Sequence, residues 1–378
     1  MQIEGEGQKV SVYIGSSDTW HGTNLAVAIV ERCRKLGFAG ATVSRGVMGF
    51  GKSSRIHRAP LFGLSRDLPE KVEIIDRPER VSELLPILDG REVNPRGVWH
   101  DAWRYLRDNG PGGVTTLALA AIDIALWDLV GMERGQPLVD VIGRQRDRVQ
   151  LYGSGINLHL SVEEVVEQVR CWKADGFFAA KVKVGKPDLE EDVERLTKIR
   201  EAVGRFPLMV DANQGWSYPA AVQAFQRFEH LDLYWIEEPL PCDDVLGHAR
   251  LRARTRTPIG LGENVYTLNQ FNQYLASDAV DFVQADFGRV GGITPWLDIA
   301  ALARSFNVPM APHFTLELAA HILCATPNAL CGEMTDGGTM TDLQVIEPQP
   351  HRNGFLAPRD VPGHGLEFNW PWLNEHAR

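Results

Sequence analysis

Cysteine is scarce in this sequence, and its scarcity excludes two kinds of structural support. The 378 residues include five cysteines, an odd number with no CxxC pair among them. They are Cys33, Cys171, Cys242, Cys324 and Cys331. Neither a disulfide framework nor a cysteine-based zinc site is therefore indicated.

Positive charge and long apolar runs are also in short supply. Lys and Arg number 39 against 49 Asp and Glu, which gives a formal net charge of -10. This balance argues against nucleic-acid binding, which needs a basic face, but not against a small anionic substrate. The apolar stretches fall short of the roughly 18 residues that a membrane span needs. The opening MQIEGEGQKV lacks the basic start and apolar core of a signal peptide, so we expect a cytoplasmic protein without membrane contact.

The first 148 residues differ in texture from the rest. Residues 9–90 contain KVSVYIG, an apolar helical pattern from Leu25 to Leu36, ATVSRGVMGFG, KVEIID and VSELLPIL. This order of strand, helix, two strands and helix predicts a small α+β sandwich. Residues 91–148 instead favour helices, and VTTLALAAIDIALWDLVG has apolar residues on most sides. We expect it to be a buried helix that ends at Gly131.

From Val149 onward, short strands alternate with segments of helical period. The first helical segment, SVEEVVEQVRCWKADG, opens with a capping box of Ser161 and Glu164 and stops at Gly176. The predicted strands are VQLYGSGIN, AAKVKVG, LMVDAN, LYWIEEP, PIGLGEN, FVQADF, VPMAPH and ALCGEM. Eight strands that alternate with helices imply parallel pairing and closure into a TIM-type barrel over residues 149–335. An open doubly wound sheet is the alternative.

Three carboxylates end consecutive predicted strands, where the catalytic residues of such barrels lie. Glu237 follows Asp211 by 26 residues, and Glu263 follows Glu237 by the same interval. One such acid alone would as readily cap the next helix. Three that converge without a cation would repel each other until some of them bound protons. Mg²⁺ suits three carboxylates with water and substrate oxygens, so we predict a metal site on these residues.

Basic side chains end the neighbouring strands. Lys181 and Lys183 are two residues apart and therefore share one face of a regular strand. A lysine beside another cation has a lowered pKa and can accept a proton near neutral pH. His313 ends the seventh strand and Asp286 the sixth, so the acid can orient the imidazole. A lone histidine here would as readily be a core residue, but beside this set we interpret it as an acid/base.

These groups suit removal of a proton next to a substrate carboxylate. The carbon acid is weak, so its enediolate needs the charge neutralisation that Mg²⁺ supplies. With a lysine and a histidine on opposite sides, one group removes the proton while the other acts as an acid. Returning the proton to carbon gives racemisation, whereas protonating a departing β-hydroxyl gives dehydration.

A series of motifs in residues 91–370 resembles the enolase superfamily, in its mandelate racemase branch. AIDIALWDL, KVKVG, VDANQGW, WIEEPL, GLGEN, VGGITPW, MAPHF and the strand of Glu333 follow in family order. The resemblance implies a (β/α)7β barrel, commonly in a homo-oligomer, with one Mg²⁺ per subunit on the three carboxylates. It also implies roles for the other site residues: Lys183 and His313–Asp286 as opposed bases, Lys181 neutralising the substrate carboxylate, and Glu333 donating a hydrogen bond to the substrate. We assign Asn213 and Asn264, beside the metal ligands, to substrate binding.

Two of these motifs favour one reaction. VDANQGW and GENVY look more like acid-sugar dehydratases than like mandelate racemase. We therefore expect conversion of an aldonate or aldarate to a 2-keto-3-deoxy acid. A racemase or epimerase of a 2-hydroxy acid is the alternative on the same site. A third reading is a regulatory, ligand-binding fusion with reduced or no turnover.

The N-terminal region resembles a different family. IGSSDTWHGTNLAVAIVERCRKLGFAGATVSRGVMGFG, SSRIH and LSRDLP look like a ferredoxin-like, PII-like domain of unknown function. Its last strand is expected to be missing, because REVNPRGVW stands in its place. Enolase-type chains normally begin with a β-meander that closes over the substrate, and only a partial helical cap is expected here. The expected domains are 1–90 (PII-like), 91–148 (helical cap remnant), 149–335 (barrel) and 336–378 (a segment that packs on barrel or cap).

GVMGFGKS, from Gly46 to Ser53, matches the phosphate-loop pattern. That loop must lead into a helix, whereas SRIHRAPLFG follows, with Pro60 and no helical period. We therefore predict a glycine-rich loop between two strands. A nucleotide or other small effector can bind there through Lys52, Arg55 and His57.

Overall fold

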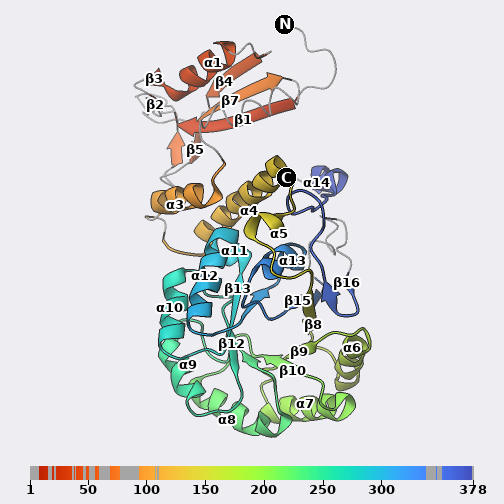
Figure 1. Cartoon of the computed structure of the whole chain (residues 1–378). Helices are drawn as coiled ribbons and strands as arrows, with labels where there is room; N and C mark the ends of the chain where they lie inside the picture. The colour runs from red at the N-terminus through yellow and green to blue at the C-terminus, as the bar shows by residue number, and fades with distance from the viewer. Residues whose placement is uncertain are drawn as a thin grey trace. The chain divides into compact units, whose positions relative to one another are not determined.

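The computed structural model contains two compact units, Met1–Val93 and Asn94–Arg378 (Figure 1). It describes residues 8–15, 19–20, 23–35, 38, 40–45, 48–50, 56–58, 69–76, 93–106, 108, 110–337, 346 and 351–376. The finer division of the second unit into cap remnant, barrel and C-terminal segment stays a prediction.

The first unit contains, among its described residues, a three-stranded sheet with the order β1-β7-β4. The central strand β7 (Pro69–Asp76) pairs antiparallel with β1 (Gln8–Gly15) and with β4 (Gly40–Arg45). α1 (Leu25–Lys35) connects β1 to β4 and has Cys33 on its buried face. β1 and β4 thus run parallel with a strand between them, as in a split β–α–β unit. The predicted α+β sandwich is confirmed to this extent.

Two short hairpins accompany this sheet. β2 (Thr19–Trp20) pairs with β3 (Thr23–Asn24), and β5 (Met48–Phe50) pairs with β6 (Ile56–Arg58). β5 lies inside the glycine-rich sequence predicted to be a loop, so that part of the prediction is wrong. A strand, β6, follows it as predicted, whereas a phosphate loop would lead into a helix. The described residues do not include Lys52, Arg55 or the predicted helix at 81–88. They also leave out Arg91 and Glu92, the first two residues of REVNPRGVW.

The second unit begins with three helices: α3 (Pro95–Leu106), α4 (Val114–Arg134) and α5 (Leu138–Ile142). The prediction that Gly131 ends α4 is wrong. The helix runs to Arg134 and ends at Gly135, whose φ of 61° is left-handed. Gly131 instead allows a close chain approach, because a Cβ there would lie 2.7 Å from the Cα of Gly363.

α4 is also less buried than predicted. Leu119 is buried, but Val114, Leu117, Ile122 and Met132 are exposed by half or more. The described neighbours of α4, which include α3, α11 and α12, cover only part of its surface.

By length and composition, α4 could cross a membrane, contrary to the expectation from the sequence. An 18-residue window has a mean hydropathy of 1.7, and 39% of that window is buried. Its Asp123, however, is buried and accepts the backbone N–H of Thr294 at 2.8 Å. α4 is therefore tied to the second unit through a buried acid.

The rest of the second unit is built around a closed barrel of parallel strands (Figure 1). The strands are β8 (Val149–Gly155), β9 (Ala179–Lys183), β10 (Leu208–Asp211), β11 (Ile236–Glu237), β12 (Ile259–Leu261), β13 (Phe282–Asp286), β14 (Met310–His313) and β15 (Gly332–Asp336). β15 pairs with β8, and a bridge from Met310 to Ala329 links β14 to the segment before β15. All eight predicted strands and the (β/α)7β barrel are confirmed.

Helices connect the consecutive strands and surround the barrel (Figure 1). They are α6 (Val162–Ala174), α7 (Leu189–Val203), α8 (Tyr218–Phe228) with the short helix η2 (Glu229–Leu231), α9 (Val245–Arg252), α10 (Leu268–Ala276), α11 (Phe287–Val290), α12 (Ile293–Ser305) and α13 (Leu316–Ala325). The predicted capping box of α6 is present, with Ser161 and Glu164 each bonded to the backbone of the other. The main apolar core lies between these helices and the strands.

The C-terminal segment returns to the start of the barrel. β16 (His351–Arg352) pairs with β17 (Phe355–Leu356), which pairs antiparallel with β8. α14 (Trp370–His376) follows and has no buried residue.

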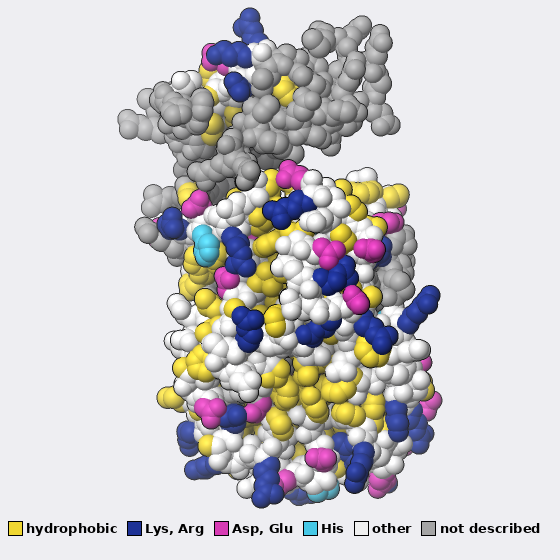
Figure 2. All heavy atoms as spheres, in the orientation of Figure 1, with side chains coloured by type: hydrophobic (Ala, Val, Ile, Leu, Met, Phe, Trp, Pro, Cys, Tyr) yellow, Lys and Arg dark blue, Asp and Glu magenta, His cyan; other side chains and the backbone are white. Residues whose placement is uncertain are grey.

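Charges of both signs are mixed on the face of the second unit that Figure 2 draws. On the face drawn in Figure 2, Lys and Arg side chains are interspersed with Asp and Glu side chains. This face therefore lacks, among its described residues, the gathered positive charge that a nucleic-acid interface needs.

Candidate metal centre and acid/base site

Strand register brings the predicted site residues together at one end of the barrel. Asp211 is in register with Glu237 on one side and with Lys183 on the other. Asp286 is likewise in register with His313. These residues end their strands, so their side chains meet at the C-terminal rim, where TIM-type barrels place their active sites.

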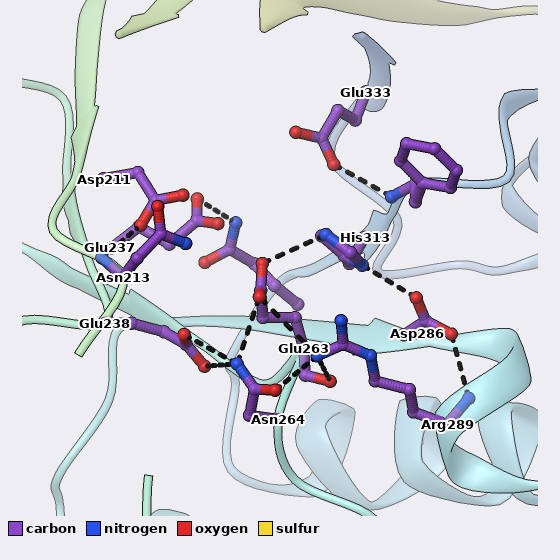
Figure 3. Close-up of polar contacts among 12 residues, drawn as sticks. Asp211, Asn213, Glu237, Glu238, Glu263, Asn264, Asp286, Arg289, His313 and Glu333 are labelled. Atoms are coloured by element: carbon purple, nitrogen blue, oxygen red, sulfur yellow. Dashed lines mark hydrogen bonds and ion pairs between the residues drawn. The ribbon is translucent and has the colours of Figure 1, made fainter. Parts of the chain in front are cut away.

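Asp211, Glu237 and Glu263 form a compact, buried cluster of acids. Each offers one carboxylate oxygen, and the three oxygens lie within 4.8 Å of one another (Figure 3). Burial and the charge of Asp211 raise the pKa of Glu237 to about 8, against the lowering effect of Lys181. Three clustered carboxylates that disfavour one another's ionisation, presented as hard oxygen donors, fit a divalent ion such as Mg²⁺. The three predicted ligands can therefore hold a metal.

The two lysines of β9 have different surroundings. Lys181 is buried, and its Nζ lies 2.8 Å from Glu237 Oε1 and 2.8 Å from Glu333 Oε1. Burial alone would lower the pKa of Lys181, but these two glutamates raise it well above its usual range. The expectation of a lowered lysine pKa therefore fails for Lys181. Lys183 is more accessible, and its Nζ lies 2.5 Å from Asp211 Oδ2.

His313 is held between two carboxylates (Figure 3). Its Nδ1 lies 2.7 Å from Asp286 Oδ2, and its Nε2 lies 3.0 Å from Glu263 Oε2. Burial alone would lower the pKa of His313, but the bond to Asp286 and the charges of Glu333 and Glu263 raise it to about 9. The predicted histidine–aspartate pair is thus formed, and the ring is also bonded to a candidate metal ligand.

Three further predicted residues lie at the same rim. Glu333 is buried and accepts the backbone N–H of Phe314 at 2.9 Å through Oε2. The backbone N–H of Asn213 donates to Asp211 Oδ1 at 2.8 Å. The Asn264 side chain donates to Glu263 at 3.0 Å and also to Glu238, so its amide group already serves the acids.

A cavity of about 310 Å³ opens at this end of the barrel. Its lining consists of Ser154, Ile156, Lys181, Lys183, Asn213, Glu263, Asp286, Arg289, His313, Phe314, Glu333 and Thr335. Lys183 and His313 therefore face one space together with Glu263, whereas Asn264 is not part of the lining. A larger cavity of about 560 Å³ includes Pro207, Pro258 and Phe282, which begin or precede strands, so it lies at the opposite end.

Three residues at the site were not predicted from the sequence. Glu238 is buried beside the metal ligands, and burial with the charge of Glu263 raises its pKa to about 7. Gln284 donates to Glu237, and Arg289 donates to the backbone oxygen of Glu263 at 2.9 Å. Gln284 stands two residues before Asp286 on β13, so strand alternation alone would have placed it on the inner face.

Comparison with known proteins shows which family this chain belongs to. A protein-family model described as "Enolase C-terminal domain-like" matches residues 164–372, more than half of the chain. The chain belongs to the enolase C-terminal domain-like family. A second model, for the uncharacterised conserved family DUF190, matches residues 7–97, in agreement with the predicted PII-like region.

Curated relatives of this enolase-type chain act on sugar acids. It is 36% identical to 3,6-anhydro-alpha-L-galactonate cycloisomerase of Streptomyces coelicolor over 74% of this chain and 77% of the relative. It is also 36% identical to L-talarate/galactarate dehydratase of Salmonella typhimurium over 81% of this chain and 72% of the relative.

A solved relative contains the metal. L-talarate dehydratase from Polaromonas sp. JS666, complexed with Mg and L-glucarate, shares 33% identity and a TM-score of 0.70. The match covers 77% of this enolase-type chain and 82% of that one.

Proposed function

We propose that the second unit catalyses Mg²⁺-dependent removal of the proton α to a carboxylate. The net reaction is dehydration of an acid sugar, an aldonate or aldarate, to a 2-keto-3-deoxy acid. One observation carries this proposal: Lys183 and His313 line the same cavity as Glu263, a member of the acid cluster. A metal-binding group and two proton-transfer groups thus face one substrate-sized space.

Asp211, Glu237 and Glu263 hold the ion in this proposal. When bound there, Mg²⁺ supplies positive charge that stabilises the developing enediolate of the substrate. Lys181 adds a fixed positive charge for the substrate carboxylate, because its pKa keeps the ammonium protonated. Glu333 and Asn213, which line the cavity, orient the substrate through hydrogen bonds. The assignment of Asn264 to substrate binding is wrong, because its side chain lies outside the lining and bonds Glu263 and Glu238 instead.

Lys183 and His313 divide the proton transfers. Lys183 Nζ removes the α-proton from one side of the substrate. His313 Nε2 then delivers a proton to the β-hydroxyl, the carbon–oxygen bond breaks, and water leaves. The resulting enol rearranges to the 2-keto-3-deoxy acid. Asp286 accepts the Nδ1 proton of His313 and keeps Nε2 directed toward the cavity.

Two other outcomes begin with the same proton removal. Cycloisomerisation is favoured by the 36% identity to the Streptomyces cycloisomerase. Racemisation or epimerisation of a 2-hydroxy acid results if His313 returns the proton to carbon. We place dehydration first because dehydratases of talarate, galactarate and arabinonate are among the relatives.

The remaining assignments belong to the whole chain. We propose a cytoplasmic homo-oligomer whose first unit binds a nucleotide or another small effector. A regulatory fusion with reduced or no turnover is the competing reading, because the expected cap is incomplete.

A substrate screen of the full chain tests the proposal. Aldonic and aldaric acids are incubated with Mg²⁺ and assayed for 2-keto acid, and in D₂O for α-proton exchange. Keto-acid formation that is abolished by EDTA and by Lys183→Ala supports dehydration. Exchange without any keto acid sinks dehydration in favour of racemisation or epimerisation. No turnover, combined with nucleotide binding by the chain, favours the regulatory fusion.

A further inference from the structure

Gln284 is a buried side chain of β13 that has no part in the proton transfers. We propose that Gln284 is a positioning residue for Glu237: it fixes the carboxylate so that one oxygen faces the metal. The inference rests on the proposed metal site and extends it to the side chains that support the ligands.

The contacts of Glu237 are unequal on its two oxygens. Oε2 accepts hydrogen bonds from Gln284 Nε2 at 2.5 Å and from Trp235 Nε1 at 3.3 Å. Oε1 faces Lys181 Nζ at 2.8 Å. Because two neutral donors occupy Oε2, the carboxylate cannot rotate freely, and Oε1 remains as the ligand atom. Lys181 can yield Oε1 to a cation because it keeps Glu333 as a partner.

The Gln284 amide is satisfied on one side only. Its Oε1 is buried and has no hydrogen-bond partner among the described residues, while its Nε2 donates to Glu237. An unpaired buried oxygen is costly, so an apolar side chain of similar size would suit the barrel interior better. The presence of an amide at this position is therefore explained by the hydrogen bond that its N–H group donates to Glu237.

Gly260 of β12 leaves the space that this arrangement needs. A Cβ at position 260 would lie 2.5 Å from Gln284 Oε1 and 3.4 Å from Trp235 Cδ1. Gln284 is only 1% exposed, so its side chain cannot swing into solvent to avoid the clash. A methyl group at Gly260 would therefore displace the Gln284 amide, and the three atoms nearest to it belong to Gln284 and Trp235, not to a metal ligand.

The test measures metal affinity directly, by calorimetric titration of Mg²⁺ into the full chain. Gln284→Leu keeps the volume but removes the donor, and outer-shell changes of this kind weaken metal binding about 10–100-fold. We expect Gly260→Ala to weaken binding in the same direction. Trp235→Phe, which removes only the weaker donor, should have a smaller effect.

Tyr152→Phe is the matched control. The Tyr152 hydroxyl is buried in the barrel interior without a hydrogen-bond partner among the described residues, so its loss should leave Mg²⁺ affinity unchanged. Thermal unfolding in EDTA identifies the variants that fold. A folded Gln284→Leu protein that binds Mg²⁺ as tightly as the wild type overturns the inference. A lower Tm without weaker binding does so too, because it shows a purely structural role.

The outcome is separable from that of the proposed reaction. If the wild type binds Mg²⁺ but turns over no acid sugar, the dehydratase proposal fails, and weakened binding in Gln284→Leu still supports the positioning role. If the wild type binds no Mg²⁺, both proposals are overturned.

Discussion

Asp286 Oδ2 lies 2.7 Å from His313 Nδ1, while Oδ1 of the same carboxylate accepts the backbone N–H of Arg289 at 2.9 Å. One acid thus orients the imidazole and caps the first turn of α11. Because Arg289 in turn donates to the backbone oxygen of Glu263, the ends of β12, β13 and β14 are tied together at this acid. The acid/base pair and the metal cluster therefore share a support.

Asp286→Asn separates the two roles of this acid, which orients His313 and caps α11. Asn is as good an N-cap as Asp, so α11 should begin as before. The negative charge that holds His313 is lost, and acid/base catalysis commonly contributes 10²–10⁴-fold, so we expect kcat to fall by about 100-fold or more. Steady-state kinetics with an unchanged circular dichroism spectrum would show this. A kcat within threefold of the wild type contradicts the proposed pair.

Lys183→Ala and His313→Asn should affect different protons. The two groups lie on β9 and β14 and face one cavity, so each serves one side of the substrate. We expect the Lys183→Ala enzyme to be unable to exchange the α-proton, in D₂O, of the acid sugar that the wild type dehydrates. His313→Asn should still exchange this proton yet form little keto acid, as followed by NMR. Equal loss of exchange in both variants would contradict the division of roles.

Glu263→Gln should uncouple metal binding from folding. Removing one of three clustered acids relieves repulsion but also removes the carboxylate that faces His313 Nε2, so we expect little change in the unfolding temperature of the metal-free protein. Mg²⁺ at about 100 times its Kd stabilises the wild type by roughly 2.7 kcal/mol, and this gain should vanish in the variant. Differential scanning calorimetry with and without Mg²⁺ measures both effects. A retained Mg²⁺ shift would remove Glu263 from the ligand set.

Metal-free stability should fall as the pH rises. The pKa of His313 is raised to about 9, so its contribution is complete below its unfolded pKa of about 6.5 and is lost as the pH rises through 9. The raised Glu237 pKa of about 8 acts in the same direction, because the folded state holds the proton more tightly.

Thermal unfolding in EDTA between pH 6.5 and 9 would reveal this decline. It should be shallower in His313→Gln. With Mg²⁺ the trend should be opposed, since a metal-bound Glu237 must be deprotonated and binding strengthens as the pH rises. A metal-free Tm that increases over this range would contradict the assigned shifts.

The orientation of α4 can be tested by two matched truncations. Leu119 is 1% exposed and Ile122 is 50% exposed on the same helix. Leu119→Ala should cost about 2–5 kcal/mol of unfolding free energy through lost burial and a cavity. Ile122→Ala should change it by about 0.5 kcal/mol or less. Urea denaturation of the full chain gives both values, and similar costs would mean that Ile122 is covered in solution.

The barrel and its rim could be predicted because their signals are local and repeated. Asp211, Glu237 and Glu263 each follow an apolar strand at the same interval, and parallel strands bring such ends together. The His313–Asp286 contact followed from the same rule. The motif resemblance then supplied roles that spacing alone does not give.

Features that depend on contacts between residues far apart in the chain could not be predicted from the sequence. Gly131 looked like a helix end, but its role is set by Gly363, more than two hundred residues away. A lowered pKa is expected for lysines at this strand end, but Glu237 and Glu333 raise the pKa of the buried Lys181. The apolar pattern of α4 suggested full burial, yet the pattern does not say how much of the helix its neighbours cover. Such facts arise only when the strands and helices are assembled.

The acid cluster draws its three members from three successive strand–helix units. A chain divided within α9 (Val245–Arg252) would leave Asp211 and Glu237 on one fragment and Glu263 on the other. Neither fragment could assemble the cluster alone, so tight Mg²⁺ binding would return only on complementation of the two halves. The ion would then act as a reporter of reassembly, independent of any substrate.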